Sequence, residues 1–266
     1  MIRDITLGQY FAGNSIIHKL DPRVKIIATV LFIVELFIVD NFWGLLIAAA
    51  ALGAVIMASG VPFGFIVRGL KAIIVILMFT VVLNLFMIDG EILWQWKFLH
   101  ITKEGLHTAV FMASRLILLI IGSSILTLTT RPLALTDGLE RLLSPFKHIG
   151  VPAHEIAMMM SIALRFIPTL LEETDKIMKA QQARGADFES GNIVKRAKSL
   201  IPILVPLFVS AFRIAQDLAM AMEARCYRGG ENRTRMNEMV FRKRDYFASA
   251  LEIVFLGLII AETIIL

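Results

Sequence analysis

The sequence predicts an all-α polytopic membrane protein with about five transmembrane helices and long amphipathic helices on the cytoplasmic side. Of its 266 residues, 57% are hydrophobic and only 18% are charged. Soluble domains average about 25% charged residues, and several uncharged runs here approach the roughly 20 helical residues that cross a bilayer. This composition argues against a soluble enzyme and a disordered chain. The single cysteine, Cys226, excludes an intrachain disulfide framework.

Five apolar runs have the length expected of membrane-spanning helices. They cover residues 24–39, 42–59, 66–88, 106–128 and 246–266. The first is expected to follow a tight turn that contains His18. In that turn Asp21 caps the helix and Pro22 takes the first helical position, where its missing N–H is not needed.

The basic residues predict the orientation of these spans. Arg3, Lys19, Arg23 and Lys25 precede or begin the first span, whereas the connector 89–104 carries three acids against two lysines. Lys and Arg collect on the cytoplasmic side of membrane proteins. The N-terminus is therefore expected in the cytoplasm of a multi-pass cell-membrane protein, and the C-terminus outside.

Three regions follow from this pattern: an N-terminal arm with four spans (1–130), a cytoplasmic region of amphipathic helices (131–245) and a final span (246–266). The middle region holds 18 of the 27 Lys and Arg and 13 of the 22 acids, yet it is rich in Leu, Ile, Met and Ala. It is too charged to span the membrane and too apolar to be a linker. Long amphipathic helices along the membrane surface fit such a composition.

Three helices are expected within the cytoplasmic region. The first starts near Thr136 and ends before Ser144. The second begins after Pro152 and runs to about Ala183, because its apolar residues recur at helical spacing. The third covers about 192–227. Two prolines should bend its first half and a glycine pair should end it, namely Pro202, Pro206, Gly229 and Gly230.

The second and third helices end on similar tripeptides. One reads Ala183, Arg184, Gly185 and the other Ala224, Arg225, Cys226. An arginine in a last turn can simply complement the helix dipole and cap free carbonyls. Two copies at the ends of neighbouring helices also suit docking, since a guanidinium between small residues can enter a partner's groove and fork onto a carboxylate.

These features resemble the transmembrane (T) component of energy-coupling factor (ECF) transporters, a family that includes the cobalt-transporter permease Q subunits. The resemblance covers essentially the whole chain. It rests on the segment from Ser15 to Lys25 (SIIHKLDPRVK), on the two arginine tripeptides and on the order of spans and coupling helices. Cys226 departs from the family pattern, which more often has glycine there.

The resemblance implies a coupling subunit of an ECF-type importer of vitamins or other micronutrients. The ends at Arg184 and Arg225 would dock into grooves of two ABC-type ATPase subunits. The apolar faces of the same helices would hold a membrane S component, in which substrate specificity resides. ATP and magnesium would bind the partner ATPases, and this chain, which has no phosphate-binding loop motif, is expected to be non-catalytic and without a cofactor of its own.

Two further sets of residues are candidates for specific roles. Methionine-rich apolar surfaces adapt to several partners, although ordinary core filling is the alternative. The expected S-component face consists of Met158, Met159, Met160, Leu204, Leu207, Phe208 and Ala211. Glu35 and Arg115 fall at similar depths in their spans and could form a structural ion pair. The histidines have no metal-site spacing, so no metal is expected.

Other functions remain as alternatives. A close one is a dedicated cobalt or nickel permease subunit of the same family, and the set of neighbouring genes would discriminate. A membrane-embedded enzyme would need an Asp, His or Ser cluster at one membrane face. A channel would need polar residues repeated along one span. The sequence has neither pattern, and its basic charge is explained by orientation in the lipid bilayer without nucleic acid.

Overall fold

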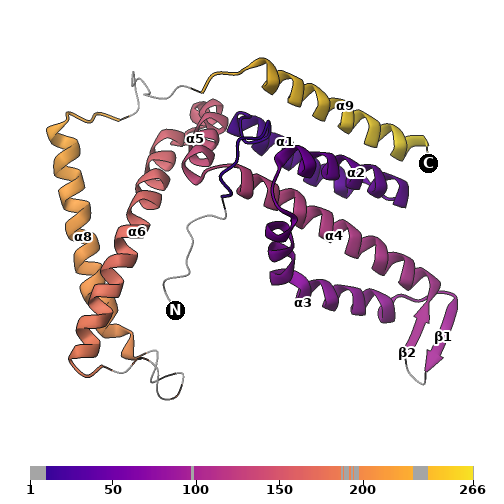
Figure 1. Cartoon of the computed structure of the whole chain (residues 1–266), viewed down its shortest axis with the longest axis horizontal. Coiled ribbons are helices and arrows are strands. Elements are labelled where there is room, and N and C mark those ends of the chain that lie inside the picture. Colours follow the sequence, from indigo (N-terminus) through magenta and orange to yellow (C-terminus); the bar gives the residue numbers. More distant parts are fainter. Residues whose placement is uncertain are drawn as a thin grey trace. The chain divides into compact units, whose positions relative to one another are not determined.

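The computed structural model describes residues 10–96, 99–186, 198–229 and 239–265, together with residues 188, 192 and 194. Helices dominate it and confirm the all-α class (Figure 1). The elements are α1 (Pro22–Ile38), α2 (Phe42–Ser59), α3 (Phe63–Met87), β1 (Ile92–Trp96), β2 (Leu99–Thr102), α4 (Lys103–Thr129), α5 (Pro132–Leu143), the 3₁₀ helix η2 (Ser144–Ile149), α6 (Ala153–Ala183), α8 (Ile201–Ala224) and α9 (Lys243–Ile265).

One compact unit contains α1 to α4, the β1–β2 hairpin and α9. Its core lies between α1, α2, α4 and α9, and the rings of Phe32 and Phe255 stack across α1 and α9 at 6.5 Å. Lipid chains are as apolar as leucine, so helix association in the membrane depends on close packing more than on burial from water. The fully or nearly buried core residues are Leu36, Val39, Leu45, Ala48, Phe111 and Ile259.

The start of α1 has the predicted geometry. Asp21 is the N-cap, its carboxylate accepts a hydrogen bond from the Arg23 backbone N–H at 2.9 Å, and Pro22 is the first helical residue. His18 lies in the preceding turn, where its Nδ1 is 2.7 Å from Ser15 Oγ and its Nε2 is 2.9 Å from the Phe11 carbonyl oxygen. This local sequence therefore determines both the turn and the helix that follows.

Five helices of the described chain are long and apolar enough to cross a membrane: α2, α4, α6, α8 and α9. The two parts of α3, Phe63–Lys71 and Ile73–Met87, are bent by 62° and together would make a sixth. At 17 residues, α1 is at the short end of the range for a span. Length and hydropathy alone thus do not distinguish spans from coupling helices, because α6 and α8 are also long and apolar enough to cross a membrane.

The connector between the third and fourth predicted spans forms an antiparallel hairpin that the sequence pattern did not indicate. In it Ile92 pairs with Thr102, and Gln95 pairs with His100. Pairing within the connector satisfies backbone groups that would otherwise lack partners near the membrane. The Thr102 hydroxyl also accepts a hydrogen bond from the Gly105 N–H at 3.0 Å and so caps α4.

The predicted start of the first coupling-region helix at Thr136 is wrong. Helix α5 begins four residues earlier, at Pro132. Proline is suited to a first turn because its φ is already helical and no N–H is needed there. Inside the helix, the Thr136 hydroxyl instead donates to the Leu133 carbonyl at 2.7 Å.

The second compact unit contains α6 and α8. Helix α6 has the predicted bounds, whereas α8 differs at both ends. Residues 193 and 195–197 of its expected first part lie outside the described residues. Pro202 is in the first turn of α8, so it does not bend a helix interior. The expected end at Tyr227, before the glycine pair, is wrong, because the chain leaves the helix after Ala224.

Candidate functional site

Helices α6 and α8 end with the same backbone hydrogen-bond pattern. At the end of α6, the Ala186 N–H donates to Gln181 O at 3.0 Å and the Gly185 N–H donates to Gln182 O at 2.9 Å. At the end of α8, the Tyr227 N–H donates to Met222 O at 3.1 Å and the Cys226 N–H donates to Glu223 O at 2.8 Å. Both sets of bonds define a Schellman motif. The likeness of the two tripeptides in sequence is therefore also a likeness in geometry.

The residue after each arginine adopts the left-handed conformation that this motif requires. Gly185 has φ +90°, and Cys226 has φ +54°. Among the described residues, Cys226 is the only non-glycine residue with positive φ. The left-handed conformation costs an L-residue with a side chain about 1–2 kcal/mol, so α8 ends at a strained position where α6 has glycine.

The backbone, not the arginine side chains, satisfies the last carbonyls of these helices. Arg184 and Arg225 occupy the C-cap positions, and both side chains are exposed. Within the described part of the chain, neither guanidinium has a hydrogen-bond or ion-pair partner, and the small residues beside them are exposed as well. Both arginines can thus reach another molecule without giving up a bond in this one.

Helices α6 and α8 pack against each other in opposite directions (Figure 1). Gln181 Nε2 donates to the Pro202 carbonyl at 3.3 Å, and the Ser210 hydroxyl donates to Glu173 Oε1 at 3.3 Å. Arg184 therefore lies at the end of the pair where α8 begins, and Arg225 lies at the other end of α8. Helix α8 has 24 residues and is therefore about 36 Å long, so the two arginines lie about that far apart along the pair.

The expected S-component face is largely uncovered in this unit. Phe208 and Met159 are 62% and 59% exposed, and Leu204 and Met160 are also exposed. Met158, Leu207 and Ala211 are half-buried. For Met159 and Met160 the core-filling alternative does not fit this exposure. Further apolar residues extend the exposed surface along α8, namely Ile201, Val205, Val209 and Phe212.

Helix α8 has two distinct apolar faces, and the expected S-component face includes residues of both. Ile203, Leu207 and Ile214 are buried or half-buried. Phe208 and Phe212 lie on another side and are exposed. Since both faces are apolar at helical spacing, periodicity alone could not indicate which of them has a partner within the chain. That distinction required the structure.

The expected ion pair between Glu35 and Arg115 is not formed. Arg115 donates to the carbonyl oxygen of Val39, lies 3.8 Å from Asp40 Oδ1 and covers the Phe111 ring at 4.7 Å. The carbonyls at the end of α1 have no helical donors, and a cation is favourable at that negative end. The carboxylate of Glu35, which is 1% exposed, has no hydrogen-bond partner among the described residues.

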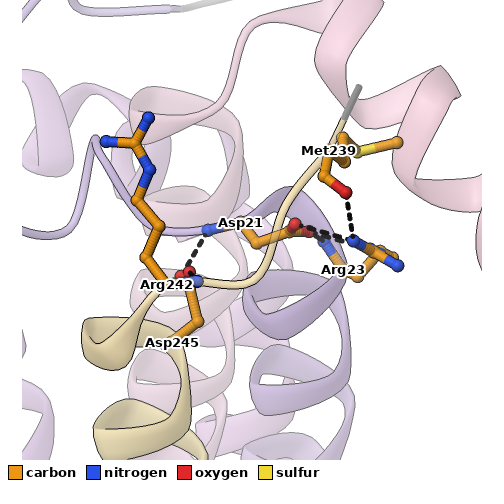
Figure 2. A network of polar contacts seen from close by, with 5 residues as sticks. All are labelled: Asp21, Arg23, Met239, Arg242 and Asp245. Atoms are coloured by element: carbon orange, nitrogen blue, oxygen red, sulfur yellow. Dashed lines mark hydrogen bonds and ion pairs between the residues drawn. The ribbon is translucent and has the colours of Figure 1, made fainter. Parts of the chain in front are cut away.

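A polar network that the sequence reading missed joins the starts of α1 and α9 (Figure 2). The buried carboxylate of Asp245 accepts from the Asp21 N–H at 2.8 Å and from the Arg242 N–H at 2.7 Å. The Arg23 guanidinium binds Asp21 Oδ2 at 3.0 Å and the Met239 carbonyl at 3.2 Å. One acid thus completes the first turn of α9 and holds α1 beside it. The only signal in the sequence was an acid at the third position of the helix, three residues after Arg242.

The fold and the paired helix ends define a class of protein: a polytopic α-helical membrane subunit whose two long amphipathic helices carry exposed arginines. The model of the cobalt transport protein family, CbiQ, matches residues 13–236, and the chain belongs to this family. The resemblance inferred from the amino-terminal segment and the arginine tripeptides is confirmed. The chain is a membrane subunit of a transporter.

Curated relatives align over nearly their full length. The protein from Thermosediminibacter oceani is 60% identical over 247 residues, which are 93% of this chain and 93% of the relative. The proteins from Clostridium kluyveri and Bacillus subtilis are 60% and 47% identical, over 94% and 92% of this chain and 93% of each relative. All three are named energy-coupling factor transporter transmembrane protein EcfT.

Proposed function

We propose that this chain is the non-catalytic coupling subunit of an ECF-type ABC importer. Arg184 and Arg225 dock into two ATPase subunits, which bind ATP and magnesium, and the motion of α6 and α8 is transmitted to a membrane S component that binds a vitamin or another micronutrient. Family membership and the names of the relatives support this role. The observation that carries it is the pair of Schellman ends, each with an exposed arginine that its own helix does not need.

The S component is proposed to lie on the exposed apolar faces of α6 and α8. Contiguous apolar patches of this kind mark sites of interaction with proteins or membranes. The face on α8 repeats along the helix at Leu204, Phe208 and Phe212, which places three large side chains in one row. A partner helix can bury such a row.

The region 131–245 is proposed to be cytoplasmic, with the N-terminus on the same side and the C-terminus outside. Helix α6 carries seven acidic or basic side chains, whereas α2 carries none. Charged side chains at the centre of a bilayer are costly, so α6 is better placed along the membrane surface than across it. The final span would then return the chain to the outer face.

Cysteine labelling tests this topology. Single cysteines at Gln95 and Asn192, in a Cys226→Ser background, are treated with a membrane-impermeant thiol reagent in intact cells. The proposed orientation requires labelling at position 95, with position 192 labelled only after the membrane is opened. Labelling of 192 but not of 95 in intact cells contradicts it.

Substitution of the arginines tests the docking role. Arg184→Ala or Arg225→Ala should leave the chain folded and inserted but weaken ATPase association, since loss of one partner of a buried charge pair costs about 2–5 kcal/mol of binding. This corresponds to roughly 30- to several-thousand-fold in affinity. Lysine should not restore docking, because it lacks the planar fork. The double substitution should nearly abolish uptake.

The measurement is pull-down of the ATPase chains by tagged protein, with substrate uptake assayed in parallel. Arg213→Ala is the matched control, because Arg213 is an exposed arginine within α8 and away from its end. Normal ATPase recovery and uptake by the Arg184, Arg225 double variant would leave the arginines without a docking function.

The description of the family model supports one alternative, a dedicated cobalt permease subunit. The two functions differ in the membrane partner. Purification of the tagged chain from native membranes and identification of the chains that accompany it would distinguish them. Several different small membrane proteins indicate a shared coupling subunit, and one constant partner indicates a dedicated subunit.

A further inference from the structure

A cavity of about 240 Å³ lies where α1 begins and α4 ends, within one compact unit. The turn before α1 forms one wall, and the end of α4 and the first turn of α5 form the other. The residues that line it are Tyr10, Gly13, Asn14, His18, Lys19, Leu20, Pro22, Lys25, Thr129, Thr130, Arg131 and Ala134. It is smaller than the roughly 300–1,000 Å³ typical of drug-sized ligands, so it suits a small group.

The charged side chains that are described in the wall of this cavity are all basic. Three of its lining side chains are cationic, Lys19, Lys25 and Arg131, and no described acid lines it. Lys25 is 7% exposed, and its ammonium group donates to Thr129 O at 2.9 Å, to His18 O at 3.3 Å and to Thr130 Oγ1 at 3.4 Å. These bonds hold the buried cation in the cavity wall, where it contributes charge without needing to move.

The acids that interact electrostatically with Lys25 are Asp21 and Asp245. Both are engaged in the network at the helix starts and neither lines the cavity. No acid of the described residues pairs with Lys19 or Arg131, so these two side chains supply the uncompensated charge. Both are exposed, and the Arg131 guanidinium lies 5.6 Å from the centre of the Tyr10 ring, a cation–π contact that orients the arginine without neutralising it.

We propose that this cavity binds a phosphate group. A planar guanidinium matches phosphate oxygens with two parallel hydrogen bonds, and the Lys19 ammonium and the Thr130 hydroxyl add a second cation and a further donor at the same cavity. Arg131 also directly precedes α5, whose first N–H groups have no helical partners and favour an anion. The shared chemistry is that of an anionic phospholipid headgroup or of free phosphate.

The position of the cavity at the ends of two apolar helices gives a lipid phosphate access to it. Basic pockets between transmembrane helices on the cytoplasmic side bind anionic headgroups in this way. A lipid held there would fix the turn before α1 against the first turn of α5. This role is independent of ATPase docking, since none of its residues belongs to the ends of α6 or α8.

The test uses the purified complex of this chain with its partner subunits, stripped of lipid in detergent. Native mass spectrometry measures its binding of short-chain phosphatidylglycerol, of phosphatidylcholine and of inorganic phosphate. The variant is K19Q with R131Q, because both residues are exposed and neither holds the fold. Lys243→Gln is the control, since Lys243 is an exposed cation at the start of α9 that does not line the cavity.

The wild-type complex and the Lys243 variant should bind phosphatidylglycerol equally, and the double variant about 25-fold more weakly. Phosphatidylcholine, whose headgroup has no net charge, should bind weakly to all three. Binding of inorganic phosphate alone, lost in the same double variant, would identify free phosphate as the ligand. Equal binding of phosphatidylglycerol and of phosphate by the double variant and the wild type would overturn the proposal.

Discussion

Replacement of Asp245 should separate α9 from α1. Its carboxylate is 2% exposed and accepts two short bonds, from the backbone N–H groups of Asp21 and Arg242. Hydrogen bonds to a charged group contribute about 1.5–3 kcal/mol each. Asp245→Ala removes both bonds and leaves the buried Asp21 N–H and the partly buried Arg242 N–H without this acceptor, so the free energy of unfolding should fall by about 3–6 kcal/mol. Asp245→Asn keeps one acceptor oxygen, so it should lower the free energy of unfolding by about half as much.

Thermal unfolding of the purified complex measures this effect. The expected order of midpoints is wild type, then Asp245→Asn, then Asp245→Ala. Asp217→Asn should match the wild type, because Asp217 is an exposed acid on α8. Asp21→Asn is an informative comparison, since it removes the ion pair with Arg23 but keeps the backbone N–H that Asp245 binds. If Asp245→Ala unfolds at the wild-type temperature, the buried carboxylate does not hold the two helices together.

Two further predictions concern α6 and α8. Cys226→Gly should relieve the left-handed strain, raise the free energy of local opening in the last turn of α8 by about 1 kcal/mol and so slow amide hydrogen exchange there. Gly185→Ala should have the opposite effect at the end of α6. Equal exchange rates in both variants and the wild type would contradict this. Phe208→Glu should abolish co-purification of the S component while ATPase recovery is retained, because the side chain is 62% exposed and a buried unpaired charge is costly at an interface. Asp217→Glu is the matched control, and an unchanged yield of S component with Phe208→Glu would place the partner elsewhere.

Local features of the chain were predictable wherever the residues that determine a feature lie within a few positions of it in the sequence. The cap at Asp21, the proline at position 22 and the bounds of α2 and α6 all agree with the sequence prediction. Each depends on an uninterrupted apolar period or on a capping residue beside the helix it caps. The family was also predictable, because the segment from Ser15 to Lys25 and the arginine tripeptides are short contiguous motifs.

Long-range pairings were not predictable. Equal depth in the membrane suggested a bond between Glu35 and Arg115, but depth does not specify the direction in which a side chain points. Arg115 instead reaches the free carbonyl at the end of α1. The cavity cations are a similar case, since Lys19 and Arg131 are 112 residues apart in the sequence and share a cavity only because α4 returns to the start of α1.

By itself the sequence determined the class of the protein, its family and the positions of nearly all its helices, because apolar content, helical period and capping act over one to a few turns. The tertiary structure decided which face of α8 packs on α6, that backbone atoms and not Arg184 or Arg225 close the two helix ends, and that Asp245 joins α9 to α1. These features depend on which elements become neighbours in space. A polar side chain can form hydrogen bonds with several alternative partners, and an apolar side chain can pack against several alternative surfaces. Only the packing of the whole chain selects one of them.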